Sequence, residues 1–372
     1  MTNLTDTPGE ELPLFYQELQ VLQLFLYDIW ACTLLFGLVS NTLNITVFLK
    51  IGFKDNVTVS LLFLSISDLI TLILNTPTIV VWFTHQHFPN HEWPFHASVL
   101  RTTFYWYGQI FYDFSSFTSV FLGLVRCACV ARPLLFKSMF TITRTLIILG
   151  VLFLAALSLR APVLSIFRID WVPKPQTNTT WLSIVYTPNF AQVFTASDVI
   201  NRNIVSWVAY IIAVACVIVL VTKLLAASRF RQSLASQTAM AHGPKNKKKT
   251  VPSSNDNSTS IRDTVKSVKE SNSQNEKTSN KLSAKDLQVI QSVTLICAIF
   301  IFSQLPFQFN STMRLVDPEM MPGRRKAYVY AYGSQIAFTF SYLNASINIL
   351  VHYNFNSRYR ETFLSLFSRK SA

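Results

Sequence analysis

The sequence is poor in charged residues for its length. Only 14% of its 372 residues are Asp, Glu, Lys or Arg, and half are hydrophobic. A soluble domain normally has about 25% charged residues, so this composition points to a membrane protein. The sequence also lacks a glycine-rich phosphate loop, a His-Glu-x-x-His motif and a Gly-x-Ser-x-Gly motif. Because these motifs carry common catalytic chemistries, we expect no enzymatic activity.

Cysteines are absent from the segments that a disulfide framework would cross-link. All five lie within apolar runs or at their ends, namely Cys32, Cys127, Cys129, Cys216 and Cys297. We therefore expect no disulfide. Cys127 and Cys129 point in different directions on a helix and have no further metal ligands nearby, so we expect no metal site there.

Long hydrophobic runs dominate the rest of the chain. A helix needs about 20 mostly apolar residues to cross a bilayer. Seven stretches qualify, at roughly 24–49, 59–84, 98–131, 143–166, 203–227, 287–313 and 327–352. None shows the strict alternation of a membrane β-barrel. The sequence therefore predicts an all-α membrane protein with a seven-transmembrane helix bundle over residues 24–352.

The distribution of basic residues predicts the orientation of this bundle. Lys and Arg collect in the first, third and fifth connections, whereas the tail 1–23 contains acids and no Lys or Arg. By the positive-inside rule, we expect a multi-pass plasma-membrane protein with its N-terminus outside and its C-terminus inside. The tail lacks a cleavable signal, so the first span should direct insertion. Sequons at Asn3 and Asn178 fall on predicted outer segments, where glycosylation is expected.

Two polar segments complete the domain organisation. Residues 228–284 are rich in Lys, Ser, Asn, Thr and Gln, and such a composition predicts a disordered cytoplasmic loop. Its lysine run at 245–249 is either a solvated linker or a contact for anionic lipid. Residues 353–367 predict an amphipathic helix on the cytoplasmic surface, followed by a tail at 368–372.

Polar residues within the predicted spans carry a family resemblance. The anchors are Asn41, Asp68, Trp93, Arg126 followed by "CACVARPL", Pro306 in "FIFSQLPF", Asn344, Asn348 and the later aromatic Tyr359. In this order they resemble the rhodopsin-like (class A) G-protein-coupled receptors over about residues 24–366. The strings "VRCACVARPLLFKSMFTITRT" and "SVTLICAIFIFSQLPFQF" resemble, more narrowly, the molluscan chemosensory-type and neuropeptide-like expansion of that family.

The resemblance implies a receptor activated by a small chemosensory molecule or a peptide. Its cytoplasmic partner would be a heterotrimeric G protein, with arrestin and a receptor kinase acting at the third cytoplasmic loop, and nucleic acid is not an expected partner. The implied activation switch consists of Arg126, Asp286, Phe300, Pro306 and Asn348. In it, Arg126 pairs with Asp286; the alternative is that Arg126 only reaches the interface as one more inner positive charge.

This chain departs from the family at several positions. Val125 replaces the acid that normally precedes the arginine, Cys127 replaces an aromatic residue, and Gln304 replaces a tryptophan. We therefore expect a weak resting lock and elevated basal activity. Another function class remains open: a polytopic transporter or channel, which would be expected to show an internal repeat and broken helices.

Two internal sites follow from the same resemblance. Asn41, Asp68, Ser115, Asn344 and Asn348 match the family's sodium pocket, where hard oxygen ligands suit Na⁺. The alternative is a hydrogen-bonded polar core without an ion; no other cofactor is expected. The expected ligand pocket contains Tyr105, Gly108, Gln109, Asp113, Arg160, Gln304, Phe338 and Tyr342.

Absent residues limit the ligand and the outer loop. Gly108 stands where biogenic-amine receptors have an acid, and residues 328–353 lack the lysine that retinal needs. Asp113 either attracts a cationic ligand or is neutralised by Arg160. Residues 167–202 contain no cysteine, so the outer loop is expected either to be held by packing of Trp171 or Trp181 or to be mobile.

Overall fold

The computed structural model describes residues 14–53, 55–131, 140–174, 179–241, 284–320 and 324–368. Its elements in chain order are α1 (Leu14–Ile51), α2 (Asn56–His87), α3 (Ser98–Ala131), α5 (Ile142–Ser165), β1 (Phe167–Pro173), β2 (Thr180–Tyr186), α6 (Phe190–Asp198), η1 (Val199–Val205), α7 (Ser206–Ala241), α9 (Ala284–Val316), η2 (Pro318–Met320), α10 (Ala327–Phe355) and α11 (Ser357–Phe367).

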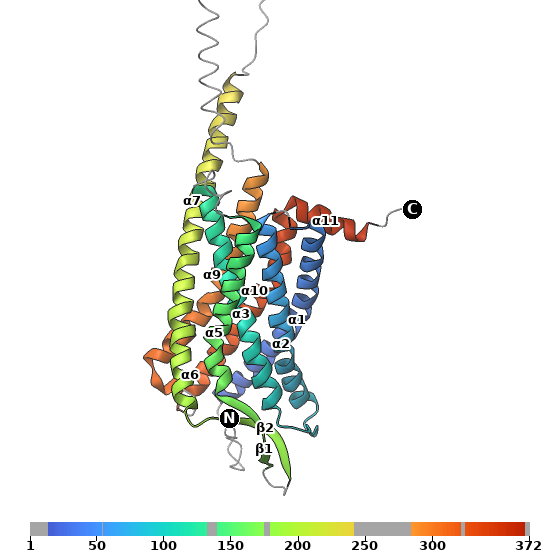
Figure 1. Ribbon diagram of the computed structural model, residues 1–372, viewed down its shortest axis with the longest axis vertical. Coiled ribbons are helices and arrows are strands. Elements are labelled where there is room, and N and C mark those ends of the chain that lie inside the picture. The colour runs from blue at the N-terminus through green and yellow to red at the C-terminus, as the bar shows by residue number, and fades with distance from the viewer. Residues whose placement is uncertain are drawn as a thin grey trace, which may run out of the picture.

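The long helices form one bundle (Figure 1). Helix α3 packs against α2, α5, α7 and α9, and α10 closes the bundle by packing against α1, α2 and α9. The β1–β2 hairpin lies at one end of the bundle and α11 runs across the other (Figure 1). We call these the hairpin end and the α11 end. Because α3 contacts four other helices, its side chains can couple them.

Six helical segments are long and apolar enough to cross a membrane. They lie in α1, α2, α3, α5, α6–α7 and α9, so the chain is an α-helical, multi-pass membrane protein. Helix α10, the predicted seventh span, has sufficient length but is less apolar than these six among the described residues. The reason is its inward face, on which Ser341, Ser346, Asn348 and His352 are all buried.

The outer surface of the bundle is apolar, in contrast to the polar inward face of α10. Large apolar side chains such as Val39, Ile147, Leu154, Ile211 and Phe309 are each about 60–70% exposed. A water-soluble protein rarely presents so continuous an apolar surface, whereas lipid tails solvate it without cost. Many polar side chains are instead buried in the interior, where several bond to one another across helices.

The β1–β2 hairpin was not expected from the sequence. The two strands pair antiparallel from Phe167 opposite Tyr186 to Pro173 opposite Thr180. The backbone N–H of His96 donates to the carbonyl of Leu182 at 2.8 Å, and the rings of His96 and Trp181 pack edge to face with centroids 4.8 Å apart. All five cysteines are free thiols, so no disulfide holds the predicted outer loop. Trp181 packing and backbone pairing hold it instead.

Trp171, the other expected packing residue of this loop, does not contribute in the same way. Its side chain is 62% exposed.

The expected boundaries of the two polar segments need correction. Helix α7 continues to Ala241 and α9 begins at Ala284, so residues 228–241 are helical and not disordered, because their Ala, Leu, Arg and Gln residues favour helix. The rest of the predicted loop, 242–283, lies outside the described residues, as does most of the N-terminal tail. Residues 353–355 belong to α10.

The chain turns between α10 and α11 at Asn356. The Asn356 side chain accepts from the backbone N–H of Tyr359 at 3.1 Å, which satisfies one of the free donors at a helix start. Tyr359 is fully buried, and its hydroxyl donates to Asn44 Oδ1 on α1 at 2.6 Å. Helix α11 is therefore anchored to the end of α1.

Candidate functional site

Asp68 lies at the centre of a buried polar group formed by three helices. Its side chain, on α2, is 2% exposed. Ser115 Oγ on α3 donates to Asp68 Oδ1 at 2.5 Å, and Asn348 Nδ2 on α10 donates to Asp68 Oδ2 at 3.0 Å. Asn348 Oδ1 is buried and accepts no hydrogen bond from the described residues. These oxygens are the hard donors that suit a small cation such as Na⁺.

Two other residues expected in this group lie elsewhere. Asn41 donates to the backbone carbonyls of Ala345 and Gly37, at 2.7 and 3.0 Å, so it joins α1 to α10. Asn344 is half-buried in an apolar groove between α9 and α10, beside Phe302. Asn344 and Asn348 are four residues apart on α10, but only Asn348 contacts Asp68. Groups of three or more metal-ligating His, Cys, Asp or Glu side chains are absent from the described residues.

Tyr112 joins α3, α9 and α10 nearer the hairpin end. Gln304 Nε2 donates to the Tyr112 hydroxyl at 2.6 Å, and the same hydroxyl lies 3.2 Å from Ser341 Oγ. Gln304 is two residues before Pro306, which interrupts the backbone hydrogen bonds of α9. Tyr112 was not predicted from the sequence, because one aromatic side chain among several on a helix carries no signal of its own.

Asp113 and Arg160 form an ion pair between α3 and α5. Arg160 Nε donates to Asp113 Oδ2 at 2.5 Å, and Arg160 Nη2 donates to Asp113 Oδ1 at 2.7 Å. The side chains are 14% and 4% exposed. This is the two-pronged geometry that a guanidinium makes with a carboxylate. Asp113 was expected either to attract a cationic ligand or to be neutralised by Arg160, and the structure shows the pair with Arg160.

A second buried charge cluster contains Asp198, Arg202 and Arg314. Arg202 Nε is 3.5 Å from Asp198 Oδ1, and Arg314 pairs with Asp198 Oδ2. Arg202 also donates to the hydroxyl of Tyr330 at 2.6 Å and to that of Tyr105 at 2.8 Å. All three charged side chains are less than 10% exposed.

This charge cluster was not predicted from the sequence, and the reason lies in the positions of its arginines. Arg202 and Arg314 each lie one residue outside a predicted span, 203–227 and 287–313, and a charge at a span end is ordinarily an interfacial group.

The π-helix η1 directs Arg202 into the bundle. Asn201, Arg202 and Asn203 are consecutive and all buried. Asn201 donates to the Leu159 carbonyl on α5 at 2.7 Å, while Asn203 accepts from Ser311 on α9 at 3.3 Å. A π segment adds a residue to the helical turn and frequently occurs at a functional site. Here it lets successive side chains contact different helices.

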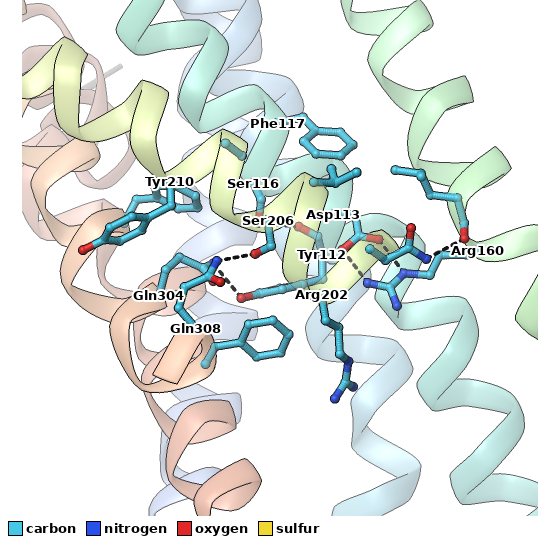
Figure 2. A pocket seen from close by; sticks show the side chains of 16 residues that line it. Tyr112, Asp113, Ser116, Phe117, Arg160, Arg202, Ser206, Tyr210, Gln304 and Gln308 are labelled. Carbon is cyan, nitrogen blue, oxygen red and sulfur yellow. Dashed lines mark hydrogen bonds and ion pairs between the residues drawn. The ribbon is translucent and has the colours of Figure 1, made fainter. Parts of the chain in front are cut away.

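Several cavities lie beside these charges, and two of them concern the candidate site. The inner cavity has a volume of about 30 Å³, room for one or two waters. Among its lining residues are Asp113, Arg160, Arg202, Gln304 and Gln308 (Figure 2). Figure 2 shows Asp113 facing Arg160 and Gln304 pointing at Tyr112. The second cavity, which we call the vestibule, is about 210 Å³ and is lined by Tyr105, Trp106, Phe194 and other residues.

The remaining ligand-pocket expectations are distributed differently. Gln109 is buried, but neither it nor Gly108 lines these two cavities. A Cβ at Gly108 would lie 3.0 Å from the Asn75 side chain, so this glycine allows α2 and α3 to approach closely. Phe338 and Tyr342 stack 6.4 Å apart. Phe338 also packs edge to face on Tyr105, at 5.7 Å between centroids.

Helices α3, α7 and α9 are in close contact toward the α11 end. A Cβ at Gly123 would lie 3.2 Å from Cys297 Sγ and 3.3 Å from Cys216 Cβ. Arg126 follows on α3 and is half-buried. Asp286 is in the first turn of α9, but its side chain lies outside the described residues, so an Arg126–Asp286 pair stays a prediction.

Further along α9, Phe300 is buried against Val120 and Ala213, and Pro306 lies within the helix. The glycosylation sites Asn3 and Asn178 lie outside the described residues.

Comparison with known proteins identifies no family for this chain. No protein-family model matches the chain, and no curated protein matches it.

Proposed function

We propose that this protein is a rhodopsin-like receptor that transmits binding of an extracellular ligand to a cytoplasmic heterotrimeric G protein. In this proposal the hairpin end is extracellular, the α11 end is cytoplasmic, and α10 is the seventh membrane crossing. The apolar residues Leu364 and Phe367 of α11 are more than half exposed. They would lie against the inner membrane surface, with arginines of the same helix beside the lipid headgroups.

One observation carries the proposal: four other helices converge on four consecutive residues of α3, about one helical turn. Residues 112–115 of α3 contact α9 and α10 through Tyr112, α5 through Asp113, and α2 through Ser115. The inner cavity lies beside this region, lined by Tyr112 and Asp113, and the vestibule lies on its hairpin side, beside Tyr105 and Trp106. A ligand that changes the partners of Tyr112 or Asp113 would therefore change the packing of several helices together, which is what a two-state receptor requires.

Helix α9 supplies the movable element in this mechanism. Pro306 removes one backbone hydrogen bond from α9 and is a natural bending point. Gln304 ties the helix to Tyr112 two residues before this point, on its α11 side. Closer to the α11 end, Phe300 and Cys297 pack near Val120 and Gly123 of α3. Release of the Gln304–Tyr112 bond would allow the α11 end of α9 to move away from α3 and Arg126, exposing a site for the G protein.

The Asp68 group fits a regulatory role in the same mechanism. Asp68 joins α2 to α3 and α10. A sodium ion held by oxygens of Asp68, Ser115 and Asn348 would favour one arrangement of these helices. In this proposal the receptor lies in the plasma membrane. Arrestin and a receptor kinase would bind on its cytoplasmic side, at the segment between α7 and α9.

The test is a second-messenger assay in cells that express the full chain with a promiscuous G protein. We expect basal or ligand-stimulated signalling that Arg126→Ala abolishes. Arg144→Ala, which removes an exposed arginine from the same end of the bundle, is the matched control and should signal normally. Equal signalling by the wild type and Arg126→Ala, at equal surface expression, would contradict the proposal.

A further inference from the structure

The buried charges at the hairpin end do not cancel. The two clusters contain three guanidinium groups, of Arg160, Arg202 and Arg314, and two carboxylates, of Asp113 and Asp198. Asp113 is fully engaged by Arg160, so Asp198 alone must neutralise both Arg202 and Arg314. One positive charge remains in excess among groups that are less than 15% exposed. A buried charge without a counter-ion is costly.

Arg202 is the less neutralised of the two arginines that share Asp198. Its Nε lies 3.5 Å from Oδ1 of that carboxylate. Its two terminal nitrogens donate to the neutral hydroxyls of Tyr105 and Tyr330. These hydroxyls satisfy the hydrogen bonds but supply no charge. The two-pronged face of the guanidinium, which binds a carboxylate best, is thus held by groups that an anion would replace favourably.

Arg314 has a separate unsatisfied donor. Its Nε–H is buried and has no hydrogen-bond acceptor among the described residues. The guanidinium lies over the Tyr330 ring at 4.6 Å and over the Phe194 ring at 5.7 Å. Rings attract the cation weakly and accept no strong hydrogen bond, so Arg314 adds to the positive field around Arg202.

Aromatic rings separate both arginines from the vestibule. Tyr105 and Phe194 both line that cavity. The Tyr105 hydroxyl contacts Arg202, and the Phe194 ring contacts Arg314. Rotation of the Tyr105 side chain would therefore connect the 210 Å³ vestibule with Arg202. Trp106 and Phe190 supply further apolar walls, and the exposed Arg101 adds a positive charge at the same cavity.

We propose that Arg202, supported by Arg314, binds the carboxylate of a small organic monoanion whose apolar body occupies the vestibule. The single excess charge matches a monocarboxylate, and the aromatic walls match an aryl or alkyl body. The size of the vestibule favours a small molecule over a peptide chain. The statement that a monocarboxylate is the receptor's ligand rests on the proposed function. Binding of the carboxylate can nevertheless be measured without signalling.

The experiment is thermal unfolding of the purified full chain in detergent, with and without paired ligands. The probes are butanoate, hexanoate, octanoate, benzoate and 3-phenylpropanoate, each compared with its primary amide. We expect at least one carboxylate to raise the unfolding temperature in a saturable way while its amide does not. Failure of every carboxylate to do so, or equal shifts from the amides, overturns the proposal.

Two variants locate the site. Arg202→Gln should weaken carboxylate binding at least about tenfold, or ~1.4 kcal/mol, whereas Arg168→Gln, the same change at an exposed hairpin arginine, should leave it unchanged. Tyr105→Phe keeps the ring and removes the hydroxyl that competes for Arg202, so binding should tighten about 3- to 10-fold. This second variant decides the question if Arg202→Gln does not fold. Unchanged or weaker binding by Tyr105→Phe contradicts the proposal.

The same measurements separate this inference from the receptor assignment. Carboxylates that bind through Arg202 but evoke no second messenger would leave the anion site standing and count against the receptor. A second-messenger response to another ligand, with no carboxylate binding, would leave the receptor standing and remove the anion site.

Discussion

Gln304 Nε2 donates to the hydroxyl of Tyr112 at 2.6 Å, and this bond joins α9 to α3 two residues before the proline in α9. The Tyr112 hydroxyl also lies within reach of Ser341 on α10. One hydroxyl therefore connects three helices. Its removal is the most direct test of whether the bundle is held in a resting arrangement by this contact.

We expect Tyr112→Phe to raise ligand-independent signalling and to lower stability by about 1–2 kcal/mol, because a buried Gln304 amide loses its acceptor. The control is Tyr210→Phe, which removes a hydroxyl from the same cavity without breaking a bond between α3 and α9. Basal second-messenger level and unfolding temperature are the two measurements. Identical basal levels in the two variants would show that the contact is only structural.

The Asp113–Arg160 pair should behave as one unit. Asp113→Asn or Arg160→Gln alone leaves its buried partner without a counter-ion, and each should cost about 3–5 kcal/mol of stability. The double variant restores neutrality and should be destabilised by less than the sum of the two single changes. Thermal unfolding of all three variants measures the coupling. Strict additivity would mean that the pair contributes no specific interaction.

Helix α11 should depend on one buried hydroxyl. Tyr359→Phe removes the hydrogen bond to Asn44 while keeping the ring packed against Phe48. We expect a loss of about 1 kcal/mol, and faster amide hydrogen exchange confined to α11. Tyr353→Phe, at the α10 end, serves as the comparison. Exchange that accelerates equally throughout the bundle would indicate a general destabilisation instead.

The contact between His96 and the hairpin should weaken in acid. His96 Nδ1 accepts from the backbone N–H of Ser98 at 3.1 Å, which requires that nitrogen to be unprotonated. Burial, then the positive charge of Arg101 and then His85, lowers the pKa of His96 from its ordinary 6.5. The unfolded state therefore binds the proton more readily. The stability of this contact is fully present above pH 6.5 and falls as the pH drops through and below that value.

Tryptophan fluorescence reports this pH dependence, because the His96 ring packs on Trp181. We expect the wild-type signal to change below the ordinary histidine pKa, and the change to be absent from His96→Gln and from Trp181→Phe. A titration that persists in His96→Gln would assign it to another group.

Much of the architecture could be predicted from sequence. Helices α2, α3 and α5 begin and end within a few residues of the predicted spans, because lipid demands long apolar runs and the chain has few other places to start or stop them. The Asp68–Ser115–Asn348 contacts agree with an expectation drawn from family resemblance. Asn41 and Asn344, expected in the same group, lie apart from it, because a shared helix face does not determine the depth or rotation at which side chains meet.

The β1–β2 hairpin and the charge cluster around Arg202 show a different limit. Residues 167–186 contain mixed polar and apolar side chains whose pairing depends on contacts with the loop before α3. Arg202 and Arg314 lie more than 100 residues apart in the chain and meet at Asp198 and Tyr330, after η1, α9 and α10 have packed. Sequence spacing contains no information about such a meeting.

The amino-acid sequence by itself determined that this chain is a helical membrane protein, because the length and apolarity of each run set whether it can cross lipid. Only the tertiary structure decided which polar groups face one another. A π turn rotates Arg202 inward, and Arg160 rather than a ligand neutralises Asp113. These outcomes depend on helix rotation and packing distance, quantities that arise only when side chains from separate helices compete for the same interior space.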